Sequence, residues 1–229
     1  MAEEACEEIA RMRRKIQKIS KERVLFLDET AVRLSEAPSS TLVARGEKSF
    51  VLATDTSSYA KRFDMIACCN GSQVFPPMIF TPIDRSDAGV RGINKKMLIK
   101  YIQEILAQQV GALNKYPIYL VMDRASIHSR ELVQEFHDMG CEELKEVLLM
   151  PTNAAKRMSP LDNALFHDWK EAVRKHGQMT LSNIEQVMAD EWNRISGNKI
   201  KAHYKHCALT DGQDVYKDCP QPASHAHGN

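Results

Sequence analysis

The amino-acid sequence predicts an α/β protein with a mixed sheet that helices cover on both faces. Three apolar runs have the length and continuous hydrophobicity of strands buried on both sides: residues 24–30, 117–123 and 146–151. A strong hairpin signal, Asn70-Gly71-Ser72, joins two more strand candidates at 62–69 and 74–81. Because a hairpin is antiparallel, the sheet is expected to be mixed rather than purely parallel.

Segments with helical periodicity alternate with these strands. Residues 3–22 carry a thin apolar stripe, and residues 94–113 form an amphipathic pattern that Asn94 caps. Further helices are predicted at three places: 129–139, from Ser159-Pro160 to about 176, and 182–195. The polar residues 31–49 are predicted to form a surface loop.

The predicted organisation has one main domain. Residues 1–22 are predicted to be a lead-in helix or linker, residues 23–200 the main folded domain, and residues 201–229 a polar, disordered tail. The tail contains His and Cys, but their spacing fits no standard zinc site. The six cysteines are scattered, which favours reduced thiols.

Composition excludes several classes of protein. The 229 residues contain 31 Lys and Arg against 30 Asp and Glu, so any contact with nucleic acid has to come from local patches. No apolar run approaches the ~20 residues that a bilayer requires. The N-terminal residues lack the apolar core of a secretory signal. We therefore expect a soluble intracellular protein without membrane contact.

Carboxylates follow the first two apolar runs. If those runs are neighbouring parallel strands, Asp28 and Asp123 lie at the same edge of the sheet. Asp162 lies in the first turn of a helix, where the preceding loop can return it to that edge. Three converging carboxylates require a counter-charge, and oxygen ligands without His or Cys select Mg²⁺ or Mn²⁺. Two such ions about 4 Å apart suit in-line displacement at phosphorus.

Each aspartate also has a purely structural interpretation. Asp162 is a favourable first-turn acid for a helix dipole. Asp123 can cap a strand end, and Asp28 with Glu29 can form a solvated edge. The order and spacing of the elements favour the shared site over these separate roles.

Three segments resemble the acidic motifs of mariner-like transposases, which belong to the DDE integrase and transposase group: LFLDET (25–30), YLVMDRASIHS (119–129) and LMPTNAAKRMSPLDNALFHDWK (149–170). The family's first motif ends in Asp-Glu-Ser/Thr, its second has Asp followed by His, and its third has Asp or Glu two residues after Pro. Here Asp28, Asp123 and Asp162 occupy the three acidic positions. The resemblance covers residues 20–195, and the spacings lie within the family's range.

The resemblance implies a ribonuclease-H-like fold with a mixed five-stranded sheet flanked by helices. It implies that Asp28, Asp123 and Asp162 are catalytic and hold two Mg²⁺ or Mn²⁺ ions for phosphodiester cleavage and strand transfer. The implied partners are DNA (transposon ends and target) and a second copy of the chain in a homodimer. The implied location is the nucleus.

The sequence departs from the family at three places. The stretch NAAKRM (153–158) replaces the family's usual aromatic, Pro-rich approach to the third motif. Arg124 replaces the usual Asn, and it either pairs with Asp123 or contacts a substrate phosphate. Residues 1–23 hold at most one helix, so we expect the chain to lack the family's N-terminal helix-turn-helix DNA-binding module. The predicted DNA-binding residues around the acids are Arg124, His128, Lys156 and Arg157.

Two other functions stay open at this point. One is a catalytically inert or host-adopted transposase remnant that binds nucleic acid or protein, which the Arg124 replacement and the missing module favour. The other is an unrelated metal-dependent nuclease with the same fold. An inert remnant would show no metal affinity that depends on the acids.

Overall fold

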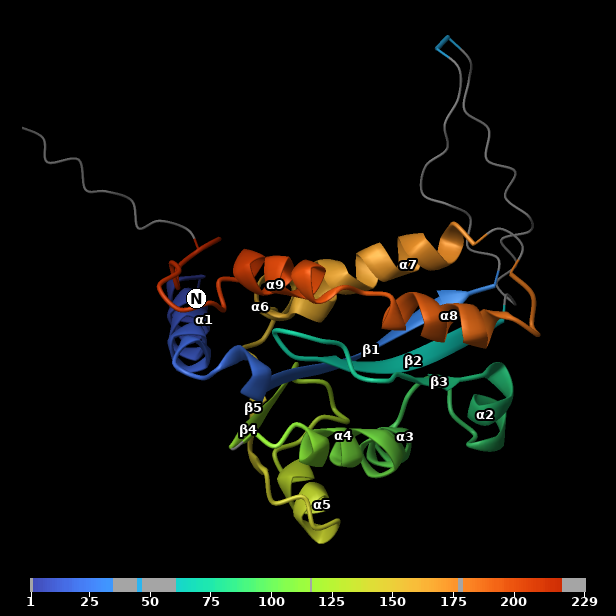
Figure 1. Cartoon of the computed structure of the whole chain (residues 1–229), viewed down its shortest axis with the longest axis horizontal. Helices are drawn as coiled ribbons and strands as arrows, with labels where there is room; N and C mark the ends of the chain where they lie inside the picture. The colour runs from blue at the N-terminus through green and yellow to red at the C-terminus, as the bar shows by residue number, and fades with distance from the viewer. Residues whose placement is uncertain (1, 35–44, 47–60, 116, 177–178, 220–229) are drawn as a thin grey trace, which may run out of the picture.

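A mixed five-stranded sheet lies between two helical layers (Figure 1). The computed structural model describes residues 2–34, 45–46, 61–115, 117–176 and 179–219. The strands are β1 (Val24–Arg33), β2 (Arg62–Cys69), β3 (Met78–Phe80), β4 (Ile118–Met122) and β5 (Leu144–Leu149). Their order across the sheet is β3-β2-β1-β4-β5, with β1, β4 and β5 parallel and the β1–β2 and β2–β3 pairs antiparallel. The predicted mixed sheet is confirmed.

The helices divide between the two faces of the sheet (Figure 1). One layer comprises α1 (Ala2–Gln17), α6 (Ala155–Met158), α7 (Phe166–Arg174), α8 (Ile184–Asn193) and α9 (Gly197–His206). The other comprises α3 (Lys95–Tyr101), α4 (Ala107–Ala112) and α5 (Leu132–Asp138), with α2 (Pro82–Asp87) next to β3. Shorter turns complete the chain at Lys21–Arg23 (3₁₀), Ile102–Leu106 (π) and Leu161–Leu165 (π).

Alternate residues of β1 enter two separate cores. Val24 and Phe26 pack with the layer that contains α7, α8 and α9. Leu25 and Leu27 pack with the layer that contains α3, α4 and α5. Burial on both faces explains why β1 reads as an unbroken apolar run rather than an alternating one.

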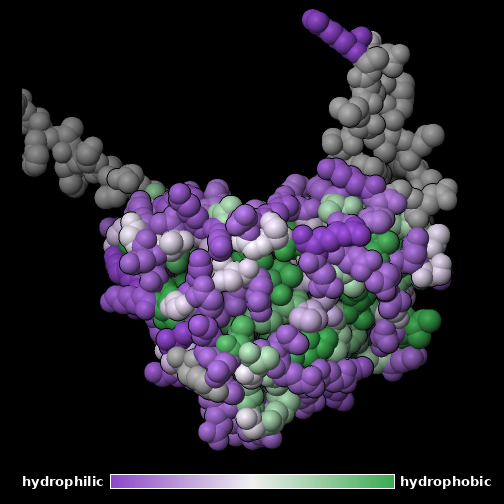
Figure 2. Space-filling view, viewed as in Figure 1, coloured by the Kyte–Doolittle hydropathy of each residue, from purple (hydrophilic) through white to green (hydrophobic). Residues whose placement is uncertain are grey.

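The surface is mainly hydrophilic on the face shown in Figure 2, where hydrophobic residues are visible chiefly between the two helical layers. Within the described ranges, every helix is too short or too polar to cross a membrane.

Several element boundaries differ from the predicted ones. β1 continues to Arg33 because its second half pairs with β2, from Asp28 opposite Ala67 to Arg33 opposite Arg62. β3 begins only at Met78, since Pro76 and Pro77 lack the N–H groups that a strand ladder needs. Residues 35–44 and 47–49 of the predicted loop lie outside the described residues.

The C-terminal part of the chain is more ordered than predicted. Helix α9 runs across the expected boundary at residue 200, and Leu209 beyond it is buried. The guanidinium of Arg13, which is fully buried in α1, donates to the carbonyl oxygens of Val215 (3.0 Å) and Lys217 (2.7 Å). These contacts anchor residues 207–219 on α1, and only residues 220–229 of the predicted tail lie outside the described residues.

The turn between β2 and β3 provides a stability prediction. A Cβ atom on Gly71 would lie 2.5 Å from the Cβ of Lys21, so Gly71→Ala forces the backbone apart. We expect a loss of about 1–3 kcal/mol in the free energy of unfolding, measured by denaturant titration. Gly111→Ala is the matched control, because α4 leaves open space there and alanine favours a helix by up to about 1 kcal/mol. Equal stability of both variants would contradict the predicted clash.

Candidate active site

The register of the central strands brings Asp28 and Asp123 together. Parallel pairing aligns Val24 with Tyr119 and Phe26 with Val121. Asp28 and Asp123 each follow the last of these pairs by two residues, so they occupy equivalent positions at the end of the β1–β4 ladder. The parallel register therefore brings these two carboxylates to one edge of the sheet, where the sequence predicts them.

Asp162 reaches the same edge from a widened helical turn. It lies in the π-helical turn Leu161–Leu165, and its backbone N–H donates to the hydroxyl of Ser159 (3.3 Å). π turns often occur at functional sites because they redirect side chains. The carboxyl groups of Asp28 and Asp162 share a hydrogen bond. Strand β1 and the third acidic segment therefore meet through their acids.

The pKa values of the two hydrogen-bonded acids are raised, so both carboxyl groups resist ionisation. Burial and the negative charges of Asp162 and Glu29 raise the pKa of Asp28 to about 9. Desolvation and the charges of Asp123 and Glu29 also raise the pKa of Asp162, although its hydrogen bond with Asp28 and the nearby Lys156 oppose this shift. The site therefore has a deficit of positive charge.

The donor set fits a hard divalent cation. Asp28, Asp123 and Asp162 offer only carboxylate oxygens, which Mg²⁺ and Mn²⁺ prefer. Within the described part of the chain, however, no three acidic, His or Cys side chains already lie close enough to form a complete metal-binding group. Asp123 acts on Asp162 through its charge, whereas Asp28 and Asp162 are in direct contact.

His128 links the second acid to β1. Its Nδ1 lies 2.7 Å from Oδ1 of Asp123, and its Nε2 lies 2.9 Å from Oε1 of Glu29. Burial would lower the pKa of His128, but hydrogen bonds and the charges of Glu29 and Asp123 outweigh it and raise this pKa to about 9. These contacts favour the protonated imidazole, which can donate to both carboxylates.

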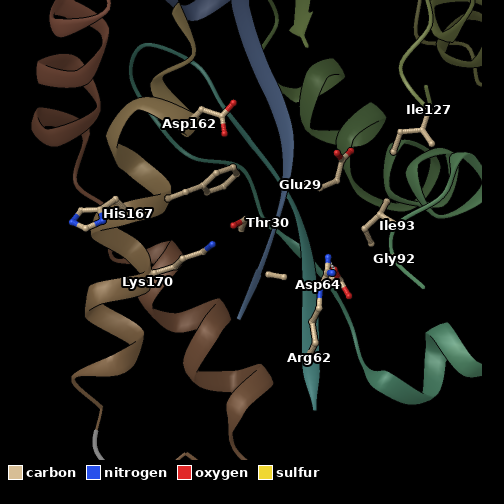
Figure 3. A pocket seen from close by; sticks show the side chains of 12 residues that line it. Glu29, Thr30, Arg62, Asp64, Gly92, Ile93, Ile127, Asp162, His167 and Lys170 are labelled. Carbon is tan, nitrogen blue, oxygen red and sulfur yellow. Dashed lines mark hydrogen bonds and ion pairs between the residues drawn. The ribbon is translucent and has the colours of Figure 1, made fainter. Parts of the chain in front are cut away.

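Two clefts flank Asp162. A cleft of about 710 Å³ extends from Asp162 and Glu29 past β2 to α7, and in Figure 3 Asp162 and Glu29 lie on opposite sides of β1. Its basic side chains are Arg62, His167 and Lys170. A second cleft, of about 560 Å³, is lined by residues that include Asp123, Arg124, Lys156 and Asp162. Asp162 thus lies between two clefts that both have basic side chains in their lining.

The predicted DNA-binding residues have different surroundings. Arg124 is exposed, and its Nε donates to the carbonyl of Met150 (3.1 Å), which directs it along the second cleft. Lys156 and Arg157 are exposed on α6, and Lys156 lies near Asp162. His128 is buried, and both of its ring nitrogens contact carboxylates. Contact of these four residues with DNA stays a prediction.

Sequence reasoning missed the part played by Glu29. The sequence pattern favours a solvated edge for this residue, but its side chain contacts His128 and its backbone N–H donates to Oδ1 of Asp28 (2.7 Å). The sequence signal that could have indicated this role is the pair of adjacent acids, Asp28 and Glu29, in the first motif. Another unpredicted group borders the larger cleft: buried Asp64 pairs with Arg62 and with Arg85 (2.9 Å).

The sheet topology and the three aspartates at one edge define a ribonuclease-H-like α/β domain with an acidic centre. Comparison with known families narrows this class. Residues 88–205, just over half of the chain, match the family described as DDE superfamily endonuclease, and the protein belongs to that family. A comparison with curated protein sequences found no match.

Solved structures of Mos1 transposase have the same fold. The isolated catalytic domain of Mos1 mariner transposase superposes with a TM-score of 0.60 at 10% identity, covering 95% of this chain and 91% of that one. A Mos1 paired-end complex with Mn gives 0.66 at 12% identity, covering 95% and 60%. A paired-end complex with the left transposon end gives 0.62 at 14% identity, also covering 95% and 60%. This chain therefore spans about three fifths of the longer Mos1 chains.

Proposed function

We propose that the chain is the catalytic domain of a mariner-type DDE transposase that cleaves phosphodiester bonds and transfers strands on DNA. The observation that carries this proposal is the contact between Asp28 and Asp162, whose pKa values are both raised by burial and by neighbouring negative charges, beside Asp123 at the same sheet edge. A cluster of this kind is stable in its ionised form only when cations bind to it.

In this proposal, Asp28, Asp123 and Asp162 hold two divalent ions. Bound Mg²⁺ or Mn²⁺ would activate the attacking oxygen and stabilise the leaving oxygen at phosphorus. Arg124, Lys156 and Arg157 bind the phosphates of the DNA and position the strand across the acids. Mos1 structures with Mn, with Mg and with a transposon end support this choice of metal and substrate. We further propose a homodimer that acts on transposon ends and target DNA in the nucleus.

A catalytically inert module that binds nucleic acid or protein is the second candidate. One observation favours it: within the described residues, the three carboxylates do not yet form a complete metal-binding group. This candidate predicts a folded protein in which the acids have no affinity for divalent ions.

Calorimetric titration with Mn²⁺ separates the two candidates. We expect the parent to bind Mn²⁺ and both Asp28→Asn and Asp162→Asn to weaken that binding, because the two residues share one site. Asp138→Asn is the matched control, since α5 ends at the opposite edge of the sheet, shortly before β5 begins. A well-folded parent that fails to bind Mn²⁺ would instead identify the inert module.

A further inference from the structure

A buried histidine connects two strands at the acidic centre. The side chain of His128 is fully buried, with Nδ1 at 2.7 Å from Asp123 and Nε2 at 2.9 Å from Glu29. Glu29 belongs to β1, whereas Asp123 and His128 belong to the segment that follows β4. The pair therefore fixes the loop after β4 against β1.

The contacts at Asp123 are concentrated on one oxygen. Oδ1 accepts from Nδ1 of His128 and from the backbone N–H of Ala125 (2.9 Å). Oδ2 is then the oxygen through which Asp123 would bind an ion. The side chain of Asp123 is 39% exposed, and the residue lines the second cleft, so this carboxylate is accessible as well as oriented.

Glu29 contacts the first acid directly and is linked to the second through His128. Its backbone N–H donates to Oδ1 of Asp28 (2.7 Å), while its side chain reaches Asp123 through His128. One residue thus orients Asp28 directly and Asp123 through one intervening ring. Outer groups that orient metal-binding carboxylates typically change metal affinity 10–100-fold when they are removed.

We propose that Glu29 and His128 are positioning residues that hold Asp123 in its metal-binding orientation. This inference rests on the proposed function, because it assumes that Asp123 binds a divalent ion. Neither residue needs to touch the ion or the DNA. Their effect is transmitted along the chain of hydrogen bonds from Glu29 through His128 to Asp123.

The test measures Mn²⁺ affinity by calorimetry, without DNA and without turnover. His128→Ala and Glu29→Ala are each expected to weaken Mn²⁺ binding about 10–100-fold. The double variant is expected to bind no more weakly than the weaker single variant, because both residues act through one chain of contacts. Glu29→Gln keeps an oxygen acceptor for His128 and is expected to restore most of the affinity.

Matched variants distinguish positioning from general damage. His137→Ala removes another histidine, whose Nε2 contacts the carbonyl of Leu144, and is expected to leave the Mn²⁺ affinity unchanged. Thermal melting reports whether each variant is folded. If His128→Ala does not fold, the comparison of Glu29→Ala with Glu29→Gln decides, since Glu29→Ala retains the backbone donor to Asp28.

The failure of this inference differs from the failure of the proposed function. If Asp123→Asn weakens Mn²⁺ binding while His128→Ala and Glu29→Ala stay within twofold of the parent, the positioning role is wrong and the metal site stands. If Asp123→Asn also binds like the parent, the metal site itself is wrong, and the positioning role is wrong with it.

Discussion

Asp28→Asn is expected to raise the melting temperature of the metal-free protein at pH 8 by about 4–8 °C, which corresponds to about 2 kcal/mol for a chain of this size. Asp28 is only 8% exposed and contacts Asp162. Burial and the neighbouring acids raise its pKa to about 9, so the folded protein opposes ionisation of this group. Asparagine keeps the shape of the side chain, still accepts from the N–H of Glu29, and carries no charge.

The sign of the pH dependence follows from the direction of this shift. Between the ordinary pKa of an aspartate, near 4, and the raised value of about 9, the folded state binds more protons than the unfolded state. The contribution of Asp28 to stability is therefore lost as the pH rises through this interval. The advantage of Asp28→Asn over the parent is expected to be larger at pH 8 than at pH 5, as measured by thermal melting with a chelator present.

Asp64→Asn provides the contrasting control. Burial raises the pKa of Asp64 as well, but the charges of Arg62 and Arg85 oppose this shift. Both guanidinium groups pair with Asp64, so removing its charge leaves them without this partner. This variant is expected to melt below the parent. If Asp28→Asn also melted at or below the parent at both pH values, the charge repulsion inferred at the acidic centre would be wrong.

The sequence predicted the central strands well because their signal is local. Continuous apolar runs identify β1, β4 and β5, since such runs are needed where both faces of a strand are buried. The sequence also shows directly which of these apolar runs are followed by an acid. Parallel register then turns two separate local signals, Asp28 and Asp123, into one site.

The contacts around those acids were not predictable from local pattern. Glu29 and His128 are 99 positions apart, and their contact depends on how the loop after β4 folds back onto β1. Arg13 likewise belongs to the polar side of a helical pattern, but it is buried because residues 215–217 cover it. The contacts of these side chains are made with parts of the chain that are distant in the sequence, and composition and periodicity do not predict such contacts.

Asp162→Asn is expected to reduce metal-dependent nicking of supercoiled plasmid DNA by about 10³-fold, to the level of the metal-free control. In the proposed function Asp162 helps to hold the ions, so its loss would remove several kcal/mol of stabilisation from the transition state, and about 4 kcal/mol corresponds to this factor. Asp162→Glu is expected to retain part of the activity, because it keeps the charge and adds one methylene at a position where mariner-like sequences have either acid.

Substitution of a second aspartate in the same helical segment tests whether the loss of nicking activity is specific to Asp162. Asp168 follows Asp162 by six residues, pairs with Lys199 (2.9 Å) and His203 (3.3 Å), and has no contact with the acidic centre among the described interactions. Asp168→Asn is expected to nick DNA like the parent. If Asp162→Asn retained full activity, or if both variants lost it equally, Asp162 would have no specific part in the chemistry. Loss in Asp162→Asn alone would tie the chemistry to the widened turn that carries this acid to Asp28.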